Sequence, residues 1–388
     1  MNSLPPELIR AIVEEIDDVE SWKMCALVAT IFREHAQRSL LWSLNLGGDE
    51  AKSSTATWSL LQESPHLARY FKRLLYIPPS EEVSLEELHA LCAVLDRLSN
   101  VRQCYFIGDP DLENICSWSD IPPQLAIASV KFIRRQTRLQ ELHIVSIGGL
   151  PSDTLIQFFG VAPTLSLLQT TVDITTTVGD PPSPVDSVVQ NLCLLASSDM
   201  SVVLLTAQFL PHLTGIRKLW VQPDVEKSDE RISTFAQNLD HLSLECKVKP
   251  SSVIPPLPQL PFLQSAELSL DFDDRDEPWF VGHLAAILTA ASDALKEICI
   301  TYDPFPSSLL NHSSTPETMA AVECAIVGSA FSPRIRWRVD VDALSEAEEF
   351  LSGFIASLRD GMPKLHEQGR LIIERYSADD GFGNWTLR

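Results

Sequence analysis

The chain has little positive charge and no long apolar segment. Against 52 acidic residues it has only 30 basic ones, and its formal net charge is −22. Such a surface repels phosphate groups, so neither nucleic acid nor an anionic membrane is an expected partner. No segment approaches the roughly 20 apolar residues that a membrane-spanning helix needs, and acidic residues interrupt the N-terminus where a signal peptide would be apolar. We therefore expect a cytoplasmic or nuclear protein.

Catalytic and metal-binding motifs are also missing. The chain holds no GxSxG, P-loop, GxGxxG or HExxH motif, and none of its eight cysteines forms a CxxC pair. The stretch DFDDRDEPW does not fit a calcium loop, because Asp276 and Gly282 stand where glycine and glutamate are required. We interpret it as a charged loop that caps a helix at Pro278, or alternatively as an acidic patch for a basic substrate. The sequence predicts no enzyme, no cofactor and no metal, and cysteines that are small buried hydrophobes.

The chain does have a sharply defined N-terminal segment, MNSLPPELIRAIVEEI. Pro5 and Pro6 fit the first turn of a helix, where no N–H is needed, and apolar residues then recur with helical spacing. Asp17 or Asp18 can cap a second helix over VESWKMCALVA, and Thr30 can cap a third over IFREHAQRSLLW. Three helices in about 40 residues bury a marginal core, so this unit should lean on a neighbour or a partner.

From about residue 53 onward, short apolar strands alternate with helical segments. The strands share the pattern apolar-x-x-apolar-x-apolar, the core LxxLxL pattern of leucine-rich repeats. Its closing LxL points alternate side chains into a core, while the residue between them faces outward. A strand–helix unit of this kind cannot bury its apolar face alone, so units stack. Clear copies start at Val101, Leu139, Ile216, Leu239 and Leu295, and looser copies lie at 71–76 and 266–272.

The spacing of these copies is irregular. Successive starts at 71, 101, 139, 216, 239 and 295 differ by 23 to 77 residues, and the longest step should hide two further units, at TLSLLQTTVDI and around SVVLLTAQFL. A helix over LSEAEEFLSGFIASLRD and a last strand at RLIIERY follow, and the Pro- and Ser-rich stretches 176–186, 249–261 and 303–317 are predicted loops. The expected fold class is α/β (α+β), in which three N-terminal helices precede an irregular leucine-rich-repeat-like solenoid of short parallel strands and helices.

Two groups of polar residues admit a functional interpretation beside a plain one. The segment KFIRRQTR gathers Lys131, Arg134, Arg135 and Arg138 near a helix C-terminus, where cations are stabilised. His143 occupies an outward position of an LxxLxL copy. For both groups we favour a solvated face over a binding role.

The N-terminal segment resembles the F-box. LPPELIRAIVEEI followed by WKMCALVATIFREHAQRSLLW is similar to that family's LPxEL opening, its apolar stretch ending in Leu-Val and its closing tryptophan. The segment LLQESPHLARYFKRLLYI looks like the linker helix of fungal F-box proteins with leucine-rich-repeat-like tails. The chain departs from the family over Ala29-Thr30-Ile31-Phe32, where a serine or cysteine with basic residues is usual. The resemblance implies an F-box over 1–46, a linker helix and first strand over 47–78, and a substrate-recognition array over 79–388.

The resemblance also implies a function. An F-box docks on the adaptor (Skp1-like) of a cullin-RING ubiquitin ligase of the SCF type, and through it on a cullin, while the tail selects a protein substrate for ubiquitin-dependent degradation. The chain would then be a non-catalytic substrate-recognition subunit, with substrate-binding residues unknown. The adaptor-binding residues so implied are Leu4, Pro5, Pro6, Leu8, Ile9, Ile12, Leu27, Val28 and Trp42. For Leu8, Ile12 and Val28, packing within the three-helix unit is about as good an interpretation.

Two alternatives stay open at this point. In one, the chain is a protein-interaction scaffold and its F-box-like helices only cap the end of the solenoid, as terminal repeats require. Removal of residues 1–46 separates these cases, since an array that then unfolds favours the scaffold. In the other, the chain is an enzyme with an unrecognised site, which a pocket joining distant carboxylates and a histidine would support.

Overall fold

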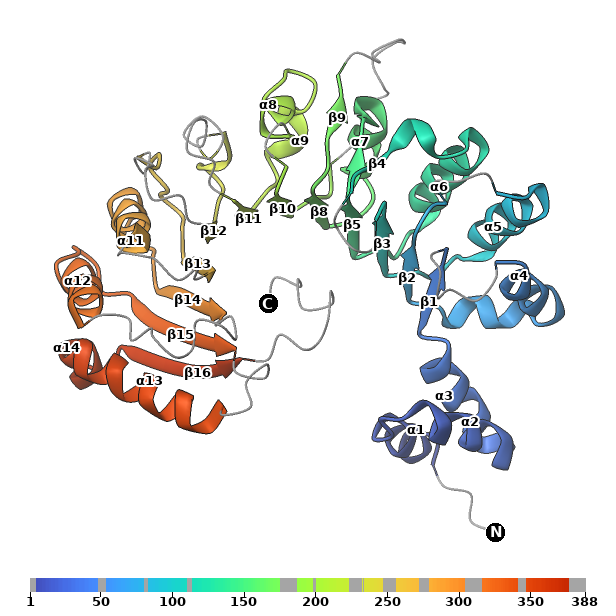
Figure 1. Cartoon of the computed structure of the whole chain (residues 1–388), viewed down its shortest axis with the longest axis horizontal. Coiled ribbons are helices and arrows are strands. Elements are labelled where there is room, and N and C mark those ends of the chain that lie inside the picture. Colours follow the sequence, from blue (N-terminus) through green and yellow to red (C-terminus); the bar gives the residue numbers. More distant parts are fainter. Residues whose placement is uncertain are drawn as a thin grey trace. The chain divides into compact units, whose positions relative to one another are not determined.

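The computed structural model describes residues 5–47, 54–79, 83–109, 114–174, 187–197, 200–222, 232, 234–246, 256–271, 279–303, 316–340 and 347–376 (Figure 1). The chain divides into two compact units, Met1–Val189 and Gln190–Arg388. Each unit is mixed α/β, and in the first unit the helices within residues 54–158 lie on one side of the strands, while the three N-terminal helices precede the first strand (Figure 1). None of the helices in the described ranges has the length and apolar character needed to cross a membrane.

The first unit begins with the three helices that the sequence predicts. They are α1 (Pro6–Glu14), α2 (Val19–Val28) and α3 (Thr30–Leu40), and α3 packs against both of the others. Pro5 stands just before α1, where its missing N–H costs no helical hydrogen bond.

The caps of α2 and α3 differ from each other. Asp18 caps α2, because its carboxylate accepts a 2.7 Å hydrogen bond from the backbone N–H of Ser21. The prediction that Thr30 caps α3 is wrong. Ala29, with φ −149° and ψ 142°, occupies the cap position, and Thr30 is already the first helical residue.

Five parallel strands follow in the first unit. They pair in chain order, and they are β1 (Ser43–Leu46), β2 (Arg73–Tyr76), β3 (Gln103–Ile107), β5 (Glu141–Val145) and β8 (Thr164–Leu168). The helices beside them are α4 (Ser54–Glu63), α5 (Leu85–Arg97), α6 (Pro123–Arg135) and α7 (Ser152–Phe158), with 3-10 turns η1 (Pro65–Tyr70) and η2 (Trp118–Asp120). Two short parallel pairs join β4 (Cys116–Ser117) to β6 (Ile147–Gly148) and β7 (Leu150–Pro151) to β9 (Val172–Asp173).

The register of this sheet explains the LxxLxL pattern. Corresponding leucine positions of neighbouring strands are direct partners, so they form continuous buried rows across the sheet. One such row is Leu44, Leu74, Cys104, Leu142 and Leu165. Each strand completes the core of the next, and a single strand–helix pair would therefore expose its apolar face.

The second unit repeats this arrangement. Its parallel strands pair in chain order, and they are β10 (Asn191–Leu195), β11 (Lys218–Val221), β12 (His241–Cys246), β13 (Ser265–Asp271), β14 (Glu297–Asp303), β15 (Arg334–Asp340) and β16 (Leu371–Tyr376). Its helices include α8 (Met200–Leu204), α9 (Leu210–Leu213), α11 (Trp279–Ala290), α12 (Pro316–Val327), α13 (Ala347–Gly361) and α14 (Pro363–Glu367). The predicted last helix and last strand are confirmed as α13 and β16.

The face of the second unit's sheet that lies away from its helices carries linked charges. Arg336 donates two hydrogen bonds to the carboxylate of Glu297, at 3.0 and 3.1 Å, and a further one to Glu374. These carboxylates raise the pKa of the Arg336 guanidinium above its ordinary value. Alternate residues of β15 point the other way, and Ile335 and Trp337 are buried.

Three predictions about elements need correction. The step of 77 residues does contain two further strands of the main parallel run, β8 within TLSLLQTTVDI and β10 (NLCLL), but the stretch SVVLLTAQFL, around which the second unit was predicted, begins in helix α8 (Met200–Leu204). The strand RIRWRVD (β15) is missing from the predicted set. The segment LLQESPHLARYFKRLLYI, which resembles a linker helix, is not one continuous helix, because α4 ends at Glu63 and Pro65 begins a separate 3-10 turn.

Other predicted features lie wholly or partly outside the described residues. The loop at 176–186 lies outside entirely, as do most of the loops at 249–261 and 303–317 and all of DFDDRDEPW except its first and last residues.

Burial corrects two further expectations. Cys104, Cys193 and Cys299 are buried as predicted, but Cys324 is exposed. His143 does not lie on a solvated face. It is 4% exposed and stacks on the ring of Tyr105, with ring centroids 4.3 Å apart.

Candidate docking surface

The core of the three-helix unit is small. Among the described residues of α1–α3, only Ile9, Val13 and Ala36 are buried, and α2 contributes none. The indole N–H of Trp22 donates a 3.3 Å hydrogen bond to the carbonyl of Val13, which ties α2 to α1. Three buried side chains remove little apolar surface from water, so the helices have much apolar surface left over.

Helix α1 divides its apolar residues between two faces. Ile9 and Val13, four residues apart, pack inward, whereas Leu8 and Ile12, also four residues apart, are each about half exposed. The exposed pair forms an apolar stripe on the surface of α1. The helix therefore has one face for its own core and another that nothing in the described chain covers.

Helix α2 exposes its apolar residues more fully. Leu27 is 78% exposed and Val28 72% exposed, and Met24 lies on the same face because it is three and four residues before them. Val19 at the start of α2 and Ile31 at the start of α3 are also exposed.

Trp42 lies where α3 meets the sheet. Its backbone is fixed, because its carbonyl accepts hydrogen bonds from the N–H groups of Lys72 and Arg73 at 2.9 and 3.0 Å. Its indole is nevertheless 47% exposed. The first 42 residues thus supply eight of the seventeen large exposed apolar side chains in the described chain. We call these eight the N-terminal apolar surface: Leu8, Ile12, Val19, Met24, Leu27, Val28, Ile31 and Trp42.

The structure places the residues implied by the resemblance as follows. Five of them belong to the N-terminal apolar surface, namely Leu8, Ile12, Leu27, Val28 and Trp42. Pro5 is exposed and Pro6 is the first residue of α1, while Leu4 lies outside the described residues. Ile9 is in the core of the three helices and cannot contact a partner without their rearrangement.

Sequence reasoning missed Val19, Met24 and Ile31. Met24 could have been found, since it is three and four residues before Leu27 and Val28 and so shares their helical face. Val19 and Ile31 carry no such signal, because they stand at the first turns of α2 and α3.

Charged residues of α1 and α2 pair within their own helices. Arg10 contacts Glu14 and Lys23 contacts Glu20, each at 2.6 Å and each largely exposed, so these pairs add little stability. Hydrogen bonds from the side chain and the backbone N–H of Ser21 lower the pKa of Asp18, which keeps this cap ionised. Within the ranges that the structure describes, no group of three or more His, Cys, Asp or Glu residues could hold a metal. The N-terminal apolar surface offers contact area rather than reactive groups.

Comparison with known proteins adds no relative. No family model matches the chain, and no curated protein sequence matches it.

Proposed function

We propose that this protein is a non-catalytic substrate-recognition subunit of a cullin-RING ubiquitin ligase of the SCF type. In this proposal α1–α3 are an F-box that docks on the adaptor, and the strands and helices after them are an irregular leucine-rich-repeat-like solenoid that binds a protein substrate. The observation that carries the proposal is the N-terminal apolar surface. Seven large apolar side chains stay exposed on helices that bury only three, and Trp42 just after α3 adds an eighth.

Apolar surface of this amount favours a permanent or frequent partner. Soluble monomers rarely expose contiguous apolar patches of more than a few hundred Å², and larger ones mark interaction sites. Full burial of a leucine contributes about 1.5–3 kcal/mol, so covering Leu27 alone would be a substantial part of a binding free energy. Pairs spaced by three and four residues on α1 and α2 suit packing against helices of a partner.

The remainder of the chain suits recognition. Parallel strands that pair in chain order leave one residue in two on the face away from the helices. These residues differ in chemistry and in exposure. The Tyr105–His143 stack of the first unit is nearly fully buried, whereas the Arg336 network of the second unit is partly exposed and is therefore the part of this face that is open to a substrate. Repeat architectures commonly use such a face to bind other proteins.

The first experiment measures affinity for the adaptor of the native cell's ligase with purified proteins. Leu27→Asp places a charge in the centre of the proposed contact and should weaken binding by at least about tenfold, as expected of a buried interface residue. Leu85→Asp is the matched control, because Leu85 is a leucine of similar exposure, 72%, on α5. Equal affinity of the two variants, or no binding of the unaltered chain at micromolar concentration, would overturn the proposal.

A scaffold whose N-terminal helices only cap the solenoid is the alternative. One observation favours it: Trp42 and β1 continue directly into the sheet, so these helices are attached to its first strand. A truncation that removes residues 1–41 keeps β1 and the Trp42 carbonyl. If the remaining chain loses its cooperative thermal unfolding, the helices act as a cap. If it stays folded but no longer binds the adaptor, docking is their role.

A further inference from the structure

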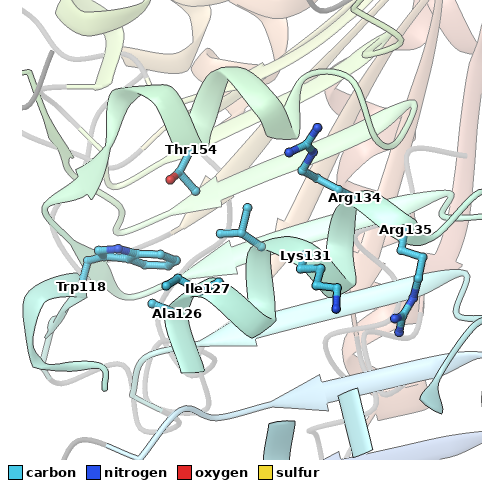
Figure 2. A pocket seen from close by; sticks show the side chains of 8 residues that line it. Trp118, Ala126, Ile127, Lys131, Arg134, Arg135 and Thr154 are labelled. Carbon is cyan, nitrogen blue, oxygen red and sulfur yellow. The ribbon is translucent and has the colours of Figure 1, made fainter. Parts of the chain in front are cut away.

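A groove on the helical side of the first unit is separate from the N-terminal apolar surface. It has a volume of about 780 Å³ and lies between α6, the turn η2 and α7 (Figure 2). Its lining changes character along its length. Trp118, Ala126 and Ile127 form one end, and Lys131, Arg134 and Arg135 form the other, with Thr154 of α7 on the opposite side (Figure 2). Val130 also lines the groove.

The apolar end is fixed in place yet open to solvent. The indole of Trp118 packs on the ring of Phe106, with centroids 5.9 Å apart, and this contact holds it against the body of the unit. Ile127 is 69% exposed. An apolar side chain of a ligand could therefore bind here without any rearrangement of the groove.

The cations at the basic end have different tasks. Arg135 is structural, because it contacts the Asp96 carboxylate at 2.6 Å and donates hydrogen bonds to the carbonyls of Leu95, Asp96 and Leu98 at the end of α5. Lys131 lies 3.5 Å from the same carboxylate. Arg134 is exposed, and within the described chain no ion pair or hydrogen bond engages its side chain. Arg134 is thus available to an anion, with Lys131 beside it.

The spacing along α6 defines what could span both ends. Ile127, Val130, Lys131 and Arg134 are spaced i, i+3, i+4 and i+7, so they share one face of the helix. Seven residues of helix rise about 10 Å, and an extended peptide in the polyproline II conformation covers about 9 Å in three residues and brings residues i and i+3 to the same side. A single extended segment can therefore contact Ile127 with an apolar side chain and Arg134 with an acidic one.

We propose that this groove binds an acidic peptide segment of another protein, in which an aromatic or large aliphatic residue is followed about three positions later by a carboxylate. The apolar residue packs on Trp118 and Ile127, and the carboxylate pairs with Arg134 and Lys131. Charge complementarity favours this occupant, because the lining holds three cations and no carboxylate, and Asp96, which contacts Arg135 and Lys131 from outside the lining, leaves Arg134 uncompensated. The negative end of the α6 dipole opposes an anion, but its effect is smaller than that of a charge-assisted hydrogen bond.

This inference does not depend on the proposed function, since peptide binding to the isolated chain requires no ligase. If both hold, the groove is a place where a substrate can dock. If the adaptor fails to bind but the peptide binds, only the proposed function is lost.

The test uses the full chain and a fluorescein-labelled peptide of Gly and Ser that carries one Phe, followed by Glu three and four positions later. Fluorescence anisotropy should show saturable binding that weakens as salt is added. Replacing the Phe with Ser, or the two Glu with Lys, should abolish it. Competition with a single-stranded oligonucleotide should have no effect, and displacement of the peptide by the oligonucleotide would overturn the proposal.

Two pairs of protein variants locate the binding. Arg134→Glu should weaken the peptide by about tenfold or more, whereas Arg138→Glu, an exposed cation of the same segment outside the groove, should change affinity less than about twofold. Ile127→Ser should weaken it and Leu85→Ser should not. All four side chains are exposed, so thermal midpoints should be unchanged. No binding below 1 mM, or equal affinity of the Arg134 and Arg138 variants, would overturn the assignment.

Discussion

At the scale of single residues, Gln136 shows how one buried polar side chain connects α6 to the loop between α5 and β3 in the first unit. It is 3% exposed at the end of α6. Its amide oxygen accepts a 3.2 Å hydrogen bond from the Val101 N–H, and its amide nitrogen donates to the carbonyls of Leu98 and Phe132 at 2.9 and 3.3 Å. The glutamine thus satisfies buried backbone groups of the loop that leads into β3.

Gln136→Leu should therefore be clearly destabilising. It keeps the volume roughly constant but leaves the Val101 N–H without this acceptor, and a buried unsatisfied group costs about 1–3 kcal/mol. We expect the free energy of unfolding, measured with urea, to fall by about 2 kcal/mol. Gln140→Leu is the control, because Gln140 is exposed and should change stability by less than about 0.5 kcal/mol. Equal effects of the two substitutions would mean that the hydrogen bonds of Gln136 contribute nothing.

At the scale of elements, α2 depends on its cap because it has no buried residue. Asp18→Ala removes the acceptor of the Ser21 N–H and should lower hydrogen-exchange protection of the α2 amides. Asp18→Asn is the matched variant, since it keeps an acceptor without the charge and should retain much of the protection. A result in which Asn is as poor as Ala would show that charge alone matters.

The same cap gives α2 a pH dependence. The pKa of Asp18 is lower in the folded chain than in the unfolded chain, so ionisation favours the folded helix. This contribution is fully present above the unfolded pKa of about 3.9 and is lost as the pH falls through the folded pKa. Protection of the α2 amides should therefore decrease below about pH 4 in the unaltered chain and should not show this decrease in Asp18→Asn.

Elements also show what the sequence could predict. The strands of LxxLxL copies were found because each needs only its own alternation of apolar residues. RIRWRVD was missed although Ile335, Trp337 and Val339 alternate, because arginines separate them. Those arginines are compatible with a strand only because Glu297, Glu267 and Glu374 of other strands lie within 4 Å of them. Such pairing joins residues 36 or more positions apart and leaves no local signal.

Only a part of each candidate surface could be predicted from the sequence. The apolar stripe of α1 is visible in the sequence, but not which half is buried, since Leu8 and Ile12 have the same spacing as Ile9 and Val13. That choice is made by α3, which packs on one side of α1 only. The basic end of the groove was likewise visible as KFIRRQTR. Its apolar end was not, because Trp118 comes from a separate turn and reaches the groove only through the fold.

At the scale of the whole molecule, strands that pair only with their neighbours should make stability local. In such arrays the free energy of unfolding is approximately the sum of one term for each strand–helix pair and one term for each contact between neighbouring pairs. A defect should therefore affect the nearest strand–helix pairs most. Trp337 is a suitable place for a defect. It is 2% exposed in β15 and packs edge-to-face on Phe354 of α13, with centroids 6.0 Å apart.

Trp337→Ala should cost about 3–5 kcal/mol through the cavity that it leaves. Hydrogen exchange followed by mass spectrometry should show lost protection in β14, β15, β16 and α13, and nearly unchanged protection in β2 and β3. Leu91→Ala, at a fully buried position of α5, is the reciprocal variant and should loosen α5 and its neighbours while leaving β15 protected. If either substitution lowers protection equally in both units, the chain unfolds as one cooperative body and the additive description is wrong. Local loss in both cases would mean that one unit can open while the other unit keeps its structure.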